Sequence, residues 1–226
     1  MASCMIIEDR LEVPLAARTL EEFRRWALSD EFPESGRIDF INGNIEIDMS
    51  PENAFTHGSP KVKLIQVLAA VVEEDDIGYL FSDRMRCSSV PADLSAEPDV
   101  IFISHDALDS GHVKLIEQKG GNEDDFIEIE GPPDLVVEIV SKSSVGKDTK
   151  RLPPAYFKAG VREFWLIDAR REELFFVIHG RGPRRFVAQP CDARSFQRSE
   201  VLKRKFHLER KRDRRGHWRY DLRVKG

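Results

Sequence analysis

The most informative part of this sequence is residues 133–141, which read PDLVVEIVS. Apolar residues run from Leu135 to Val140 with one interruption, and such a run is typical of a strand buried on both faces at the centre of a sheet. The interruption is Glu138. Because an unpaired ionised carboxylate in such a place costs several kcal/mol, we expect Glu138 to be held by a cation, a metal ion or strong hydrogen bonds.

A second carboxylate lies in a similarly unfavourable place. Asp99 follows Pro98 and opens the apolar strand expected over residues 99–103. If the two strands are neighbours, Asp99 and Glu138 converge at one end of them and can bind a hard divalent cation through oxygen, as Mg²⁺ prefers. The alternative is that each acid forms a buried ion pair with a nearby arginine, for instance Arg84 or Arg86.

The residue patterns around these acids predict an α/β domain. A capping box at Thr19 and Glu22 opens a short helix, and Asn42-Gly43 joins two alternating strands as a hairpin. The segment 111–130 is polar and acidic, and it is predicted to be a surface insertion. The other expected elements are helices over 59–74 and up to Ala159, and strands over 77–81, 84–90, 161–168, 173–179, 205–212 and 217–224.

Composition narrows the class of protein. The chain has 226 residues, of which 41% are hydrophobic and 33% charged, enough for one substantial core. No apolar run approaches the roughly 18–20 residues that span a bilayer, so no membrane partner is expected. Three widely spaced cysteines, Cys4, Cys87 and Cys191, form neither a disulfide framework nor a zinc-ligand pattern. A reducing cytoplasm is the natural location.

The charges are distributed unevenly. Residues 203–226 contain eleven Lys and Arg against three acidic residues, and since the net charge is −5, the preceding residues sum to −13. A basic tail on an acidic body suits a polyanionic partner. Its expected contacts are Arg212, Arg214 and Arg215, at the tip of the terminal hairpin. The alternative is a solvated hairpin whose Trp218 and Tyr220 pack it onto the body.

Several short runs together resemble the PD-(D/E)XK nucleases, and most closely the putative restriction endonuclease family within that superfamily. The resemblance covers about Thr19 to His179. It is carried by Asn42-Gly43, Met49-Ser50-Pro51, His57, Glu97-Pro98-Asp99-Val100, residues 133–141, Tyr156-Phe157-Lys158-Ala159-Gly160-Val161 and Phe164-Trp165-Leu166-Ile167-Asp168. Each run is short, but their order and combination are specific.

The resemblance implies a restriction-endonuclease-like fold, in which a mixed central sheet is flanked by helices. To this we add an N-terminal β-hairpin and a basic C-terminal β-hairpin. We divide the chain into an N-terminal extension (1–18), a nuclease-like domain (19–180) and a basic C-terminal extension (181–226) packed on the domain.

The resemblance also implies a metal-dependent endonuclease that hydrolyses DNA phosphodiester bonds with Mg²⁺ or Mn²⁺. Asp99 and Glu138 would hold the ion, which would polarise a phosphoryl oxygen and lower the pKa of a water molecule. DNA is the expected partner, and a homodimer is left open. Two alternatives also stay open: a catalytically silent nucleic-acid-binding or assembly module on the same fold, and a metal-dependent hydrolase of a small phosphate-bearing substrate.

The catalytic lysine of the superfamily is missing from its usual place, because Val140 stands two residues beyond Glu138. In this family the lysine is thought to lie in the following helix, although members commonly have it where this chain has Leu152. The candidates here are Lys142, Lys147 and Lys150. We favour Lys150, since it lies at the start of the helical segment and can reach back toward the strand.

Two further residues are candidates for the site. His57 precedes a helix and is placed to touch a metal-bound water or a phosphate, although a lone histidine is commonly a cap or a surface residue. Glu46 lies on the alternating strand before the core, where the superfamily often places an extra acid. A solvated outward face is the alternative explanation for Glu46.

Overall fold

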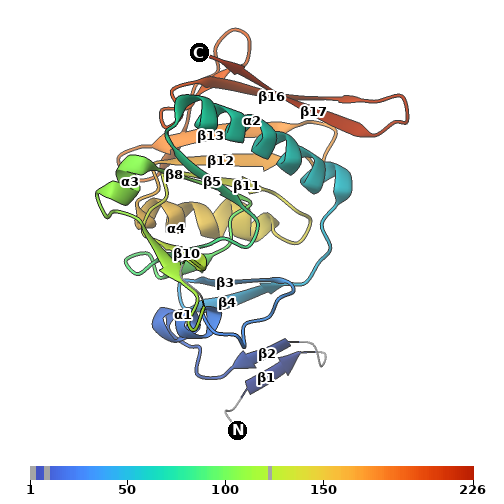
Figure 1. Cartoon of the computed structure of the whole chain (residues 1–226). Helices are drawn as coiled ribbons and strands as arrows, with labels where there is room; N and C mark the ends of the chain where they lie inside the picture. The colour runs from blue at the N-terminus through green and yellow to red at the C-terminus, as the bar shows by residue number, and fades with distance from the viewer. Residues whose placement is uncertain (1–3, 8–10, 122–123) are drawn as a thin grey trace.

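Two six-stranded sheets form the framework of the protein in the computed structural model (Figure 1). The model describes residues 4–7, 11–121 and 124–226. The central sheet has the order β14-β13-β12-β11-β8-β5, and the second sheet has the order β4-β3-β7-β6-β10-β9. Helices flank these mixed sheets, so the predicted restriction-endonuclease-like α/β fold is confirmed.

The central sheet consists of β5 (Gly78–Ser82), β8 (Val100–Ser104), β11 (Leu135–Ile139), β12 (Glu163–Asp168), β13 (Phe175–Arg181) and β14 (Phe186–Ala188). The second sheet consists of β3 (Arg37–Ile41), β4 (Asn44–Asp48), β6 (Arg86–Ser89), β7 (Leu94–Ala96), β9 (Lys114–Glu117) and β10 (Phe126–Glu130). The smaller sheets consist of β1 (Cys4–Ile7) with β2 (Leu11–Pro14), and of β15 (Gln197–Arg198), β16 (Lys205–Arg212) and β17 (Trp218–Lys225). The α-helices are α1 (Leu20–Ala27), α2 (Ser59–Asp75), α3 (His105–Asp109) and α4 (Leu152–Ala159), and two π-helical turns are η1 (Ala54–Gly58) and η2 (Lys147–Arg151).

Strand β11 is buried along its whole length, as its apolar run predicts. It pairs in parallel with β12 and antiparallel with β8. Because side chains alternate between faces, Val137 packs in the core cluster that contains α2 residues, whereas Val136 packs in the cluster that contains α4 residues. Glu138 therefore projects on the α4 side.

Local signals in the sequence place several turns correctly. The capping box at Thr19 and Glu22 is present at the start of α1. Asn42 and Gly43 both have positive φ angles, 48° and 77°, in the β3–β4 hairpin. Helix α4 begins with proline in its first turn and ends at Gly160, which has a φ of 105°.

The segment 111–130 is not the surface insertion that its polar sequence predicts. It contains β9 and β10, and β10 pairs in parallel with β6. Glu128 is buried in β10, where it accepts hydrogen bonds from Arg24 Nε (2.9 Å) and from the Ser88 hydroxyl (2.9 Å). The prediction was wrong because the partners of Glu128 are distant in the chain, and a local pattern cannot show them.

The basic C-terminal hairpin, β16 and β17, lies across α2 on the outside of the central sheet (Figure 1). Its Leu208, Tyr220 and Leu222 belong to the same core cluster as Leu64 and Leu68 of α2. The hairpin therefore packs against α2 and, through Phe206 and Trp165, against β12 of the central sheet. Among the described residues, no helix is both long enough and apolar enough to cross a membrane.

Candidate active site

The two acids singled out by the sequence meet between the two sheets. Asp99 directly precedes β8, and the pairing of Val100 with Val137 sets it opposite Glu138 on β11. The Asp99 Oδ2 atom accepts a hydrogen bond from the backbone N–H of Ile139 at 2.7 Å. Both carboxylates are buried, with Asp99 0% and Glu138 1% exposed. The acids thus lie on neighbouring strands.

Asp99 is surrounded by positively charged groups of the protein. Its Oδ1 lies 3.0 Å from Arg37 Nη2 and 3.3 Å from Lys61 Nζ, and its Oδ2 lies 3.5 Å from His57 Nε2. Burial disfavours ionisation of Asp99, but the contact with His57 and the charges of Arg37, His57 and Lys61 outweigh it and hold its pKa well below the usual range. The arginine beside Asp99 is therefore neither Arg84 nor Arg86.

Glu138 has the opposite environment. Its Oε1 accepts a hydrogen bond from the Tyr156 hydroxyl at 2.5 Å, while its Oε2 is buried with no hydrogen-bond partner in the described part of the chain. Burial, followed by the charges of Asp148 and Asp99, raises the pKa of Glu138 well above its usual range. Burial also raises the pKa of Asp148 to about 6. Around Glu138, burial and the negative charges therefore outweigh the positive charges of Arg37 and Lys147.

The donor atoms around the two acids fit a divalent cation. A buried carboxylate oxygen without a partner, such as Glu138 Oε2, is the kind of atom that a bound cation satisfies. Glu52, His57 and Asp99 each offer one ligand atom, and these atoms lie within 4.8 Å of one another. Carboxylate oxygens such as those of Glu52, Asp99 and Glu138 suit Mg²⁺ or Mn²⁺.

Two π-helical turns carry candidate residues into the site. Such turns are rare and occur frequently at functional sites. Turn η1 precedes α2 and carries His57, which is 3% exposed. Turn η2 precedes α4 and carries Lys147, whose Nζ lies 2.6 Å from Asp39 Oδ2. Lys147 is 5% exposed, and Glu138 is among the charges that act on it.

The other two candidate lysines are exposed. Lys150 lies on η2, and Lys142 lies on the loop after β11. Neither side chain makes a hydrogen bond or an ion pair with any described residue. The preference for Lys150 rests on its place at the start of the helical segment. That segment begins with the π-helical turn η2, in which Lys147 is buried and Lys150 is exposed.

Sequence reasoning missed three residues around Asp99: Arg37, Lys61 and Glu52. Arg37 begins an alternating strand, and Lys61 lies in the first turn of α2, so neither stands out in the sequence. Glu46, which was a candidate extra acid, forms an ion pair with Arg151, with Nη2 and Oε2 2.6 Å apart. The structure shows no contact between Glu46 and the two central acids.

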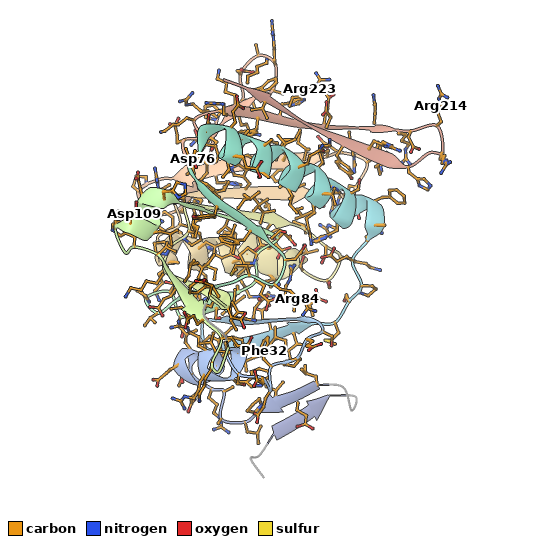
Figure 2. The ribbon with its side chains drawn as sticks, in the orientation of Figure 1. Phe32, Asp76, Arg84, Asp109, Arg214 and Arg223 are labelled. Atoms are coloured by element: carbon orange, nitrogen blue, oxygen red, sulfur yellow. The ribbon has the colours of Figure 1, made fainter. Side chains whose placement is uncertain are left out.

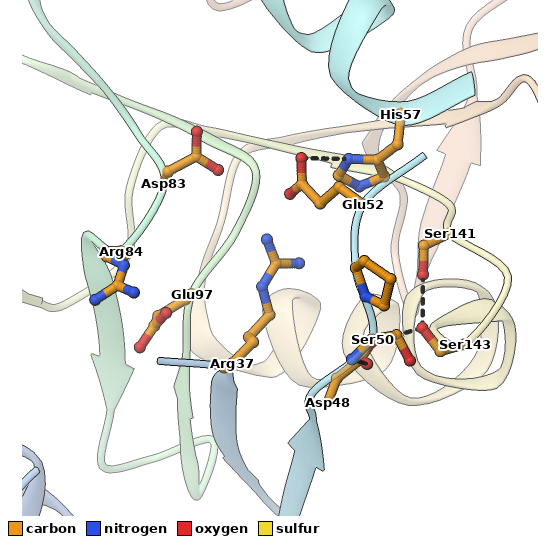
Figure 3. A pocket seen from close by; sticks show the side chains of 12 residues that line it. Arg37, Asp48, Ser50, Glu52, His57, Asp83, Arg84, Glu97, Ser141 and Ser143 are labelled. Atoms are coloured by element: carbon orange, nitrogen blue, oxygen red, sulfur yellow. Dashed lines mark hydrogen bonds and ion pairs between the residues drawn. The ribbon is translucent and has the colours of Figure 1, made fainter. Parts of the chain in front are cut away.

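A cavity of about 410 Å³ opens beside the acids (Figure 3). It is lined by Gly36, Arg37, Asp48, Ser50, Pro51, Glu52, His57, Asp83, Arg84, Glu97, Ser141 and Ser143. Two adjoining hollows share Ser50 and Ser143 with it; one also reaches Lys147 and Arg151, and the other reaches Lys142 and Arg170. The three hollows thus adjoin one another at Ser50 and Ser143.

The tip of the C-terminal hairpin lies close to η1. The rings of Phe55 and His217 stack 4.3 Å apart at an interplanar angle of 3°. Arg212 is held at the tip, with its Nη2 2.8 Å from Glu172 Oε1. By contrast, the exposed side chains of Arg214 and Arg215 form no hydrogen bond or ion pair with the described residues, and Arg214 projects away from the body (Figure 2).

Comparisons with known proteins agree with this fold. A family model named Uma2 and described as "Putative restriction endonuclease" matches residues 20–209. A crystal structure described as a putative nuclease belonging to DUF820 from Anabaena variabilis is similar with a TM-score of 0.59. The sequence identity is 19%, and the match covers 82% of this chain and 90% of that chain, so this likeness shows the fold alone. No curated protein matches the chain.

The contrast between the two acids predicts opposite effects on stability without divalent metal. Glu138→Gln removes a carboxyl group that burial and the nearby acids disfavour in its ionised form, so it should raise the free energy of unfolding. Asp99→Asn leaves Arg37 and Lys61 around a neutral amide, so it should lower that free energy. We expect changes of about 1–3 kcal/mol, measured by urea unfolding in EDTA.

The gain from Glu138→Gln should depend on pH. Because the folded-state pKa of Glu138 is raised, the wild type loses stability as pH rises from its unfolded-state value, about 4.3, through the folded-state value. The variant should match the wild type below pH ~4 and exceed it at neutral pH. Equal unfolding curves at neutral pH would contradict the assignment.

Proposed function

The chain belongs to the Uma2 family of putative restriction endonucleases, and we propose that it is a metal-dependent endonuclease that hydrolyses DNA phosphodiester bonds. The observation that carries the proposal is the buried, unpaired Oε2 of Glu138 opposite Asp99. Two carboxylates that share a buried site at one end of adjacent strands favour a divalent cation between them.

We assign Asp99 and Glu138 as the principal metal ligands. Glu52 and His57, whose ligand atoms lie close to Asp99, are the further donors. When bound, Mg²⁺ or Mn²⁺ would supply a Lewis acid that polarises a phosphoryl oxygen and acidifies water. The protein orients both acids: the Tyr156 hydroxyl holds one oxygen of Glu138, and the Ile139 N–H holds one oxygen of Asp99.

Lys147 is the lysine best placed for the chemistry. Its amine is buried, lies on the Glu138 side of the site and is held protonated by its surroundings: burial lowers its pKa, but the charge of Asp39 outweighs burial and raises it. A fixed positive charge at this place would stabilise the negative charge that develops on the phosphoryl group. We therefore propose Lys147 in this role in place of Lys150.

DNA as the substrate is supported by the shape and the charge of the surface. Several adjoining hollows near the acids, rather than one pocket, suit a polymer better than a small molecule. Arg214 and Arg215, two exposed arginines whose side chains have no partner among the residues described, lie at the tip of a hairpin that contacts η1 through His217. They can bind backbone phosphates away from the acids.

One observation favours a second function, a catalytically silent DNA-binding module. Asp99 is already compensated by Arg37, Lys61 and His57, and an acid so compensated has less need of a metal ion. Val140 also stands where the superfamily has its lysine. DNA binding without cleavage would identify this function.

Plasmid cleavage tests the proposed activity. We expect the wild type to nick supercoiled plasmid with Mg²⁺ or Mn²⁺ and to stop in EDTA. Asp99→Asn and Glu138→Gln should each lower the rate by about 100-fold or more, because each removes a metal-binding charge. The matched control is Glu163→Gln, another buried acid, whose oxygens accept from Trp165 and from the backbone of residue 200. Full activity of both site variants would refute the metal assignment.

A lysine comparison tests the proposed transition-state charge. Lys147→Met should lower kcat by about 100-fold with little change in DNA affinity, since its amine acts in the transition state. Lys142→Ala and Lys150→Ala should retain activity. If Lys150→Ala lowers kcat instead, Lys150 is the catalytic lysine, as the sequence predicts.

Point substitutions test the hairpin tip, because deletion from Lys203 onward would also remove Leu208, Tyr220 and Leu222 from the core. Neutralising both free arginines, Arg214→Gln with Arg215→Gln, should weaken DNA binding equally for all sequences. It should also reduce the slope of log affinity against log salt by about 2, since two phosphate contacts are lost. Arg223→Gln, at the other end of the hairpin, is the control (Figure 2). If the double variant has the salt slope of the wild type, Arg214 and Arg215 do not bind phosphates and the role of the hairpin is structural.

A further inference from the structure

The bend between β5 and β6 has an unusual backbone. Asp83 and Arg84 are successive residues with positive φ angles, 38° and 63°. Aspartate visits this left-handed region fairly readily, because its short side chain can bond locally, but an arginine there is disfavoured by its β-carbon. Strain of this kind persists where surrounding contacts hold it, and it clusters at functional sites. The contacts of Asp83 and Arg84 therefore indicate what the bend holds in place.

Asp83 ties the bend to the candidate active site. Its Oδ1 lies 2.7 Å from Lys61 Nζ, and the same amine lies 3.3 Å from Asp99 Oδ1. Lys61 is 5% exposed, whereas the Asp83 side chain is 52% exposed, so the bridge runs from the solvent edge of the bend into the buried site. The position of the bend is thereby linked to one of the two central acids.

Arg84 lies beside Asp83 on the wall of the cavity, opposite Ser141 and Ser143 (Figure 3). The cavity lining contains two arginines, Arg37 and Arg84. Arg37 already donates to Asp99. Arg84 is exposed and forms no hydrogen bond or ion pair with the residues that the structure describes. Its charge acts on Glu97, but the ion-pair partner of Glu97 is Arg86.

From these observations we propose that Arg84 binds a backbone phosphate of nucleic acid at the mouth of the active site, and that the strained Asp83-Arg84 bend holds it there. This inference rests on the proposed DNA-directed function. The lining also contains Asp48, Glu52, Asp83 and Glu97, which repel a polyanion. An unpaired guanidinium offsets that repulsion and can bind two phosphate oxygens at once.

The proposal predicts that stability and DNA binding change in opposite directions. Arg84→Gly removes the β-carbon that the left-handed backbone disfavours, so the melting temperature should rise by about 2–4 °C. The same change should weaken binding to a short duplex about tenfold, and should lower the salt slope by about 0.9, the value for one phosphate. Arg84→Lys keeps the charge but loses the two-pronged guanidinium, so it should recover part of the affinity. Binding is measured by fluorescence anisotropy with Ca²⁺ in place of Mg²⁺.

Two control variants separate the effect of backbone strain on stability from the effect of charge on DNA binding. Ser195→Gly relieves an exposed residue with a φ of 62° and should raise the melting temperature without affecting DNA binding. Arg25→Gln removes an exposed charge on α1, paired with Glu21, and should leave affinity unchanged.

Each remaining outcome is decisive. A wild type that binds duplex no better than Arg84→Gly overturns this inference and leaves the proposed function standing. If Arg84→Lys binds as weakly as Arg84→Gly, the positive charge at position 84 contributes nothing to binding and the phosphate contact is overturned. If the melting temperature of Arg84→Gly is lower than that of the wild type, the claim that the bend is strained is overturned. A wild type that neither binds nor cuts DNA overturns the proposed function together with this inference.

Discussion

The burial of Asp99 beside Glu138 is the constraint on which the rest of the structure depends. A buried carboxylate must be compensated, and the compensating groups of Asp99 come from three separate elements: Arg37 from β3, His57 from η1 and Lys61 from α2. These contacts hold the second sheet and the start of α2 against the central sheet. The charge of one aspartate therefore helps to determine how distant parts of the chain meet.

The positive charges that compensate Asp99 leave Glu138 largely uncompensated. Only Tyr156 bonds to it, and its second oxygen is buried without a partner among the described residues. A cation placed between the acids would remove that deficit, at the expense of competing with Arg37 and Lys61 for Asp99. A nuclease requires that a metal ion bind Asp99 more strongly than Arg37 and Lys61 do, whereas a silent DNA-binding module does not.

The C-terminal hairpin combines a structural part with a part that is free to bind. Tyr220 and Leu222 belong to the core cluster around α2, so the hairpin cannot be removed without exposing that helix. At its tip, His217 stacks on Phe55 of η1, while Arg214 and Arg215 remain exposed. Packing at one end and free charge at the other allow one element to support the fold and extend the surface beside the acids.

The sequence by itself determined the features that depend on local backbone chemistry. The buried strand with Glu138, the position of Asp99, the capping box and the Asn42-Gly43 hairpin all follow from periodicity and turn preferences, which neighbouring residues control. Only the tertiary structure decided which groups surround the acids. The burial of Lys147 rather than Lys150, the place of β10 in the second sheet and the cations around Asp99 depend on residues far apart in the chain, because burial and charge compensation act between elements and not along them.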